Sequence, residues 1–206
     1  MPRVLVLGTR NRKKLGELAE LLAPWGLILK TLTDFPNAIE VAETGDSFAA
    51  NASLKATQQA RRLGHWVLGE DSGLAVDALG GAPGIYSARF SGAGATDASN
   101  NRLLLEKLQG VPTQRRTAHY VCSAALSDPQ GVVRAQSEGI CRGRLRVDAA
   151  GSGGFGYDPL FEVVEWHQTF GELTPAVKAV LSHRSRAMRL LLPQLAALVA
   201  SGGWSP

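Results

Sequence analysis

The first residues of the chain place an apolar run, a polar turn and a helical pattern in direct succession. Residues 3–8 (RVLVLG) have the pattern of a buried strand, and residues 13–22 carry leucines at helical spacing. A strand that leads through a short turn into a helix presents backbone N–H groups and the positive helix end to an anion. This order predicts an α/β fold with an anion-binding junction near its N-terminus.

The remainder of the chain continues to mix helical and strand patterns. Helical spacing predicts further helices at residues 47–63, 97–108 and 182–199, the last one kinked at Pro193. Strand patterns lie at residues 66–69, 74–79, 117–126 and 132–140. With no repeat or linker in the sequence, we expect one α/β unit over residues 1–200 and a frayed tail over residues 201–206.

The composition fits a globular protein. Of the 206 residues, 45% are hydrophobic and 19% are charged, and no apolar run reaches the roughly 18 residues of a membrane span. No secretory signal pattern is present, so we expect a cytoplasmic protein without a membrane partner, with Cys122 and Cys141 reduced and buried. The net charge of +4 suits an anionic partner but does not separate a nucleotide from a nucleic acid.

The first chemical cluster is Thr9, Asn11, Lys13 and Lys14 at the strand-to-helix junction. Polyphosphate binding needs hydrogen-bond donors and cations at such a point, because the phosphate charge is desolvated on entry. The alternative is a capped helix with solvated lysines. The segment is not a P-loop, since the chain has no G-x-x-x-x-G-K-[ST] motif.

The second cluster combines Glu43 with Glu70-Asp71-Ser72-Gly73. Mg²⁺ prefers hard oxygen ligands and keeps several waters, so one or two carboxylates and the substrate phosphates suffice to hold it. We expect the strand at residues 66–69 to end here, with Asp71 at a glycine turn that directs its side chain into a cleft. The alternative is an ordinary turn at a strand end.

The third cluster is the glycine-rich segment at residues 153–159 (GGFGYDP). Glycines on both sides of Phe155 allow the backbone to approach a ligand while the ring offers a flat face for stacking. The alternative is a glycine-rich hairpin whose Phe155 fills the core.

The fourth cluster is Lys178 with Ser182-His183-Arg184. Ser182 has the character of an N-cap, which places His183 and Arg184 in the first turn of the last helix. Cations there oppose the helix dipole, and this local conflict indicates a functional role for the two side chains.

Taken together and in this order, the clusters resemble the inosine triphosphate pyrophosphatase family, also called XTP/dITP diphosphatases. The similar segments cover nearly the whole chain: Thr9-x-Asn11-x-x-Lys14, Glu43-Thr44-Gly45, Asn51-Ala52, Lys55-Ala56, residues 71–89, Thr96-Asp97 with Asn100, residues 153–159, and Ser182-His183-Arg184. Three positions depart from the family pattern: Arg10 stands where many relatives have Gly, Ala50 where they often have Glu, and Glu70 where bacterial members have Asp.

The resemblance implies an elongated mixed β-sheet flanked by helices, in two lobes with the active cleft between them. It implies a single nucleoside triphosphate pyrophosphatase domain over residues 1–200, a homodimer and a requirement for Mg²⁺. The implied reaction converts ITP, dITP or XTP into the monophosphate and pyrophosphate, and so cleanses the nucleotide pool. The implied partner is therefore a small nucleoside triphosphate and not a nucleic acid.

The resemblance also assigns site residues. Asp71 would be catalytic, and Glu43 and Asp71 would hold the metal. The implied substrate contacts are Thr9, Arg10, Asn11, Arg12, Lys13, Lys14, Lys55, Ser72, Phe155, Gly156, Tyr157, Asp158, Lys178, His183 and Arg184. Whether Asp71 is the base or only a metal ligand stays open.

Selection of the base is expected to rest on hydrogen bonding. Inosine and xanthosine present an acceptor at O6 where adenosine presents an amino group, and an unpaired buried donor is costly. Arg184 or His183 would refuse the 2-amino group of guanine, and the sequence leaves open which of them does so. Two rival functions also stay open: a pyrophosphatase for modified pyrimidine triphosphates, and a non-catalytic binder of nucleotides or RNA.

Overall fold

The computed structural model describes residues 3–204. Its helices are α1 (Arg12–Leu22), α2 (Phe48–Leu63), α3 (Asp97–Lys107), α4 (Pro175–Leu181) and α5 (His183–Ala200). Its strands are β1 (Val4–Leu7), β2 (Ile28–Thr31), β3 (Trp66–Val76), β4 (Thr117–Ser127), β5 (Val133–Leu145), β6 (Phe161–Val163) and β7 (Gln168–Thr169).

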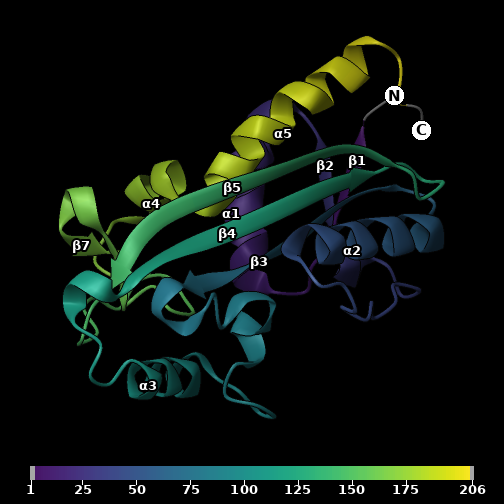
Figure 1. Ribbon diagram of the computed structural model, residues 1–206. Coiled ribbons are helices and arrows are strands. Elements are labelled where there is room, and N and C mark those ends of the chain that lie inside the picture. Colours follow the sequence, from purple (N-terminus) through teal and green to yellow (C-terminus); the bar gives the residue numbers. More distant parts are fainter. Residues whose placement is uncertain (1–2, 205–206) are drawn as a thin grey trace. The chain divides into compact units, whose positions relative to one another are not determined.

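The strands of this described part form a seven-stranded sheet in the order β2-β1-β3-β4-β5-β6-β7 (Figure 1). β1 pairs in parallel with β2 and β3, whereas β6 pairs antiparallel with β5 and β7. The sheet is therefore mixed and helices flank it, which confirms the predicted fold class. The short strands β2, β6 and β7 were not predicted.

Two compact units divide the chain. The first unit comprises Met1–Asp71, Cys122–Gly139 and Arg184–Pro206, and the second comprises Ser72–Val121 and Ile140–His183. The boundaries fall inside β3, β4, β5 and α5 and not in linkers. No linker in the sequence marks the division, because a boundary inside a strand or helix has no composition of its own.

Each unit has its own apolar core. In the first unit, Leu5 and Leu7 of β1 pack with Leu18 of α1 and Met188 of α5, all of them fully buried or nearly so. In the second unit, Tyr120, Phe161 and Phe170 form an aromatic cluster, with ring centroids 4.7 Å apart for the first pair and 5.2 Å for the second. Cys122 and Cys141 are buried free thiols, as expected.

β3 corrects the prediction of a strand that ends at a turn. It is one 11-residue strand, and Glu70, Asp71 and Gly73 lie within it. Its glycines serve close packing: a Cβ atom at Gly69 would lie 2.3 Å from the carbonyl oxygen of Ala52. Likewise, a Cβ atom at Gly73 would lie 2.4 Å from Ser87 Oγ. Glycine inside a strand marks a close approach of this kind as readily as it marks a turn.

The C-terminal segment is more ordered than a frayed tail. α5 runs on through Pro193 to Ala200. Trp204 stacks on Trp66 with ring centroids 4.4 Å apart and an interplanar angle of 11°. An indole that finds a buried partner orders the segment that carries it. Residues 205–206 of the predicted tail lie outside the described residues. Among residues 3–204, no helix is both long and apolar enough to cross a bilayer.

Candidate active site

The junction after β1 is built around Asn11. Its side chain caps α1 by accepting hydrogen bonds from the backbone N–H groups of Lys13 (3.0 Å) and Lys14 (3.3 Å). The backbone N–H groups at the start of α1, which were expected to face an anion, therefore converge on one atom in this structure, Asn11 Oδ1. Thr9 Oγ1 accepts from the Asn11 amide at 3.2 Å, which fixes the turn. The side chains of Arg10, Arg12 and Lys13 are exposed.

A single ammonium group joins the two predicted metal ligands. Lys55 Nζ lies 2.7 Å from Glu43 Oε1 and 2.7 Å from Asp71 Oδ1. Lys55 extends from α2, Asp71 from β3, and Glu43 from the loop before α2. Three residues from the loop before α2, from α2 and from β3 therefore meet at one point of the first unit.

Asp71 is buried and only partly satisfied. Its Oδ2 atom is buried and has no hydrogen-bond partner among the described residues. Burial raises the pKa of Asp71, and the Lys55 ammonium opposes this but does not cancel it. Burial lowers the pKa of Lys55, but the neighbouring Asp71 and Glu43 carboxylates outweigh burial and raise it, so Lys55 carries its charge.

The donor set at this point fits Mg²⁺. Glu43 and Asp71 offer hard carboxylate oxygens, and the orphaned Asp71 Oδ2 is a buried acceptor that a cation would satisfy. Residues 3–204 contain no cluster of three or more His, Cys, Asp or Glu side chains that could hold a metal. A complete cage of protein ligands is thus absent from this part of the chain, and an ion that keeps waters and substrate oxygens suits the pair best.

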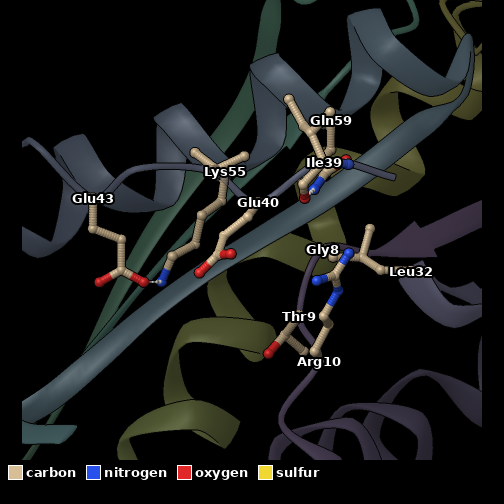
Figure 2. Close-up of a pocket in the computed structure, with 10 residues that line it drawn as sticks. Gly8, Thr9, Arg10, Leu32, Ile39, Glu40, Glu43, Lys55 and Gln59 are labelled. Carbon is tan, nitrogen blue, oxygen red and sulfur yellow. Dashed lines mark hydrogen bonds and ion pairs between the residues drawn. The ribbon is translucent and has the colours of Figure 1, made fainter. Parts of the chain in front are cut away.

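A cavity of about 260 Å³ adjoins the Lys55–Glu43 pair in the first unit. Figure 2 shows the head groups of Lys55 and Glu43 directed toward each other on one side, with Thr9 and Arg10 on another. The lining residues are Gly8, Thr9, Arg10, Leu32, Ile39, Glu40, Val41, Glu43, Lys55 and Gln59. Arg10 donates to the carbonyl oxygen of Ala38 at 3.3 Å, so its guanidinium reaches the residue directly before the loop that carries Glu43 (residues 39–45).

Arg184 lies buried in the first unit. Its side chain is 1% exposed and ion-paired with Glu17 and with Glu70, whose Oε1 atom lies 3.0 Å away. A cation in the first turn of α5 opposes the helix dipole, and these carboxylates compensate it. These two carboxylates therefore hold the guanidinium in the interior of the first unit.

Glu70 lies at the centre of the same buried network. Its Oε2 atom is 3.2 Å from Lys14 Nζ, and its Oε1 atom accepts from Cys122 Sγ at 3.3 Å. Burial and the nearby Glu70 carboxylate raise the pKa of the Cys122 thiol well above its ordinary value, so it stays protonated. Glu70 therefore connects Lys14 of α1 to Arg184 of α5.

In the second unit, Asp158 organises the glycine-rich segment. Its Oδ2 atom accepts from the Phe155 amide at 2.8 Å and from Lys178 Nζ at 2.7 Å. Lys178 Nζ also lies 4.8 Å from the centroid of the Phe155 ring, within cation–π range. Asp158 is 2% exposed, so it fixes Phe155 and Lys178 and offers little surface of its own.

The neighbouring residues are held in the same way. Tyr157 is buried and donates its hydroxyl to the Ser87 carbonyl at 2.8 Å, and Asp97 accepts from the Gly156 amide at 2.9 Å. His183 stacks on Tyr120 with ring centroids 4.6 Å apart and an interplanar angle of 9°. Ser72 lies half-buried in β3. The second unit thus gathers Phe155, Gly156, Tyr157, Asp158 and Lys178 into one structure.

The family of this chain follows from its match to a protein-family model. The model of the Ham1 family matches residues 5–194 of the chain. This chain belongs to the Ham1 family.

Its relatives match over nearly their full length. A protein of Rhodopirellula baltica named dITP/XTP pyrophosphatase is 55% identical over 98% of this chain and 97% of its own. The HAM1 protein of Coxiella burnetii has a similar structure, with a TM-score of 0.85, 34% identity, and coverage of 97% of this chain and 99% of its own. A Mycobacterium abscessus structure named nucleoside-triphosphatase / dITP/XTP pyrophosphatase has a TM-score of 0.75 at 44% identity, and covers 93% of this chain and 99% of its own.

Several residues of this Ham1 chain that shape the site were missed in the sequence. Glu17 binds Arg184, and the buried amides of Asn51 and Gln59 contact the loop that carries Glu43. The sequence did not indicate a role for Glu17, because a glutamate on a helix is ordinarily solvated. The spacing of Asn51 and Gln59 could have indicated their role, because together with Lys55 they repeat every fourth residue along α2.

Proposed function

We propose that this chain hydrolyses ITP, dITP and XTP to the nucleoside monophosphate and pyrophosphate. Membership of the Ham1 family and the similarity to proteins named dITP/XTP pyrophosphatase support this activity. The observation that carries it is the meeting of Glu43, Lys55 and Asp71 beside a cavity that Thr9 and Arg10 also line. Carboxylates and cations at one point suit a metal-assisted attack on a polyphosphate.

Glu43 and Asp71 would hold Mg²⁺ in this proposal. The support is the chemistry of the donors: two adjacent carboxylates, of which Asp71 keeps a buried oxygen without a protein partner among the described residues. When bound, the ion neutralises phosphate charge and makes a coordinated water more acidic.

Residues of the first unit would carry out the steps of the reaction. A water oxygen bonds to the α-phosphorus while the bond from that phosphorus to the α,β-bridging oxygen breaks. Asp71 accepts the proton that the water loses, and pyrophosphate departs with the bridging oxygen. Lys55, Lys14 and the Arg10 guanidinium stabilise the charge on the departing pyrophosphate.

The substrate phosphates would replace protein contacts at the junction after β1. Asn11 Oδ1 now accepts from the Lys13 and Lys14 amides, and a phosphate oxygen can take the same hydrogen bonds at the start of α1. Thr9, Arg12 and Lys13 add donors and positive charge around this point.

The base would be bound by the second unit. Phe155 offers a ring for stacking, and Lys178 offers a donor that rewards the O6 acceptor of hypoxanthine or xanthine. His183 and Arg184 are the two candidates for refusing the 2-amino group of guanine, and two carboxylates hold the Arg184 side chain in place. Asp158 and Tyr157 fix this structure through their buried hydrogen bonds.

We also propose that the enzyme acts as a homodimer in the cytoplasm, without a nucleic acid or membrane partner. The resemblance of its motifs supports the dimer, and a substrate drawn from the cellular nucleotide pool supports the location. Light scattering coupled to size-exclusion chromatography tests the dimer: a mass near twice 21.8 kDa is expected, and a mass near 21.8 kDa contradicts it.

Identification of the products tests the proposed reaction. ITP is incubated with the protein and Mg²⁺, and the phosphorus products are resolved by ³¹P NMR. IMP and pyrophosphate in equal amounts are expected. IDP with orthophosphate would show cleavage at the wrong bond, and unchanged ITP would contradict the proposed activity.

A further inference from the structure

Three polar side chains lie at four-residue intervals on α2: Asn51, Lys55 and Gln59. Residues four apart in an α-helix share one face, so the three project in the same direction. Asn51 is 0% exposed and Gln59 is 2% exposed. Buried amides are costly unless they form hydrogen bonds, so the partners of these two indicate why they are there.

Both amides hold the backbone of residues 39–45, the loop that carries Glu43. Gln59 Nε2 donates to the carbonyl oxygen of Ile39 at 2.5 Å, and Gln59 Oε1 accepts from the Ile39 N–H at 3.4 Å. Figure 2 shows Gln59 beside Ile39 at one end of the cavity, away from Glu43. Asn51 Oδ1 accepts from the Gly45 N–H at 2.8 Å at the other end of the loop.

The contact at Gly45 depends on the absence of a side chain. A Cβ atom there would lie 2.8 Å from Asn51 Oδ1 and 2.7 Å from the Cβ of Ala50. Between the two anchors, Lys55 binds the Glu43 carboxylate at 2.7 Å. One face of α2 therefore holds the loop before, at and after Glu43.

We propose that Asn51 and Gln59 are positioning residues for Glu43. Residues 39–45 contain neither helix nor strand, so the loop has no hydrogen-bond ladder of its own to fix its backbone. Two buried amides from a rigid helix supply that constraint and place the Glu43 carboxylate beside Asp71 before any cation binds. Groups that orient a metal ligand in this way set the affinity of the site for the ion. The inference rests on the proposed role of Glu43 as a ligand of Mg²⁺.

The first test measures ITP hydrolysis as a function of Mg²⁺ concentration. In Gln59→Met, which keeps the side-chain length but not the hydrogen bonds, the half-saturating Mg²⁺ concentration should rise by about tenfold. The kcat at saturating Mg²⁺ should stay within about twofold of wild type, since the chemistry is untouched. Gln58→Met is the matched control, because Gln58 lies about 100° away around the helix and should leave both values unchanged.

The second test needs no metal and no activity. In the metal-free wild type, the Ile39 and Gly45 amides should exchange hydrogen slowly for a loop, because each donates to a buried acceptor. Gln59→Met should speed exchange at Ile39, and Asn51→Ala should speed it at Gly45. If either variant fails to fold, the wild-type exchange rates at Ile39 and Gly45 alone test whether the loop backbone is held in place.

Two results would overturn the inference: a lower kcat in Gln59→Met with an unchanged Mg²⁺ requirement, or wild-type amides at Ile39 and Gly45 that exchange as in an unfolded chain. Wild-type hydrolysis of ITP without any metal would instead remove the proposed role of Glu43. In that case the exchange pattern still shows whether the two amides hold the loop.

Discussion

At the scale of single residues, Lys55 controls the electrostatics of the first unit's site. It binds Glu43 and Asp71 at 2.7 Å each, and so holds two carboxylates together that would otherwise repel each other. Burial by itself lowers the pKa of Lys55, but the two carboxylates raise it further than burial lowers it. The Lys55 ammonium therefore offsets part of the negative charge of the two carboxylates beside it.

Asp71→Asn tests the carboxylate at the centre of the mechanism. The change is nearly isosteric, so fold and nucleotide binding should persist, while kcat for ITP should fall by at least about a hundredfold because a proton acceptor and metal ligand is lost. Asp148→Asn, at an exposed position, is the control. Turnover by Asp71→Asn near the wild-type rate would reduce Asp71 to a structural role.

Arg184→Ala tests the buried ion pairs. Removing the guanidinium leaves the Glu70 carboxylate buried and less compensated, so the free energy of unfolding should fall by about 3–5 kcal/mol. The exposed Arg115→Ala should change the free energy of unfolding by less than about 0.5 kcal/mol. Urea denaturation measures both. An Arg184→Ala protein with wild-type stability and a narrowed preference for ITP over GTP would show that Arg184 reads the base and is not needed to stabilise the fold.

At the scale of elements, the turn between β4 and β5 is held by one carboxylate. Asp128 Oδ1 accepts from the amides of Gln130 (3.0 Å) and Val132 (2.9 Å), and Oδ2 accepts from Arg134 Nε at 2.6 Å. Burial acts to raise the pKa of Asp128, but these hydrogen bonds and the guanidinium outweigh burial and lower it below the ordinary value of 3.8. A lowered pKa means that ionised Asp128 stabilises the folded state.

This contribution has a definite pH dependence. It should be fully present above the ordinary pKa of 3.8 and should be lost as the pH falls through the lower pKa of the folded state. Asp128→Ala should therefore be less stable than wild type by about 1–3 kcal/mol at pH 7, and the difference should shrink below about pH 4. Urea midpoints from pH 7 to pH 3 measure it, and a constant difference would show that the charge is irrelevant to the turn.

Elements also show what the sequence could and could not predict. α1 was predictable because Leu18 and Leu22 fall on its buried face and Asn11 caps it. The continuity of β3 was not predictable from the sequence. Gly69 and Gly73 suggested a turn, and only the residues that pack closely against them show why glycine stands inside the strand. The resemblance of the chain to a family assigned Glu43 and Asp71 to one metal site. The network of Arg184, Glu17 and Glu70 was not predicted, because it depends on contacts between residues far apart in the chain.

At the scale of the whole molecule, we expect folding to be independent of a bound metal. Each unit has an apolar core built without metal ligands, and a Mg²⁺ site with two carboxylates adds little to folding. Excess EDTA should therefore abolish ITP hydrolysis while the far-UV circular dichroism spectrum and the thermal midpoint stay unchanged, and added Mg²⁺ should restore activity. Full activity in EDTA would refute the metal role of Glu43 and Asp71.

The most direct test of the proposed function compares kcat/KM for ITP, XTP, GTP, ATP and dTTP in the presence of Mg²⁺. Hypoxanthine and xanthine satisfy a donor at O6 and carry no 2-amino group, so ITP and XTP should exceed each of the other three substrates by at least about a hundredfold. Similar values for all five substrates would contradict a house-cleaning role for deaminated purines. A maximum at dTTP would instead support a pyrophosphatase for pyrimidine triphosphates.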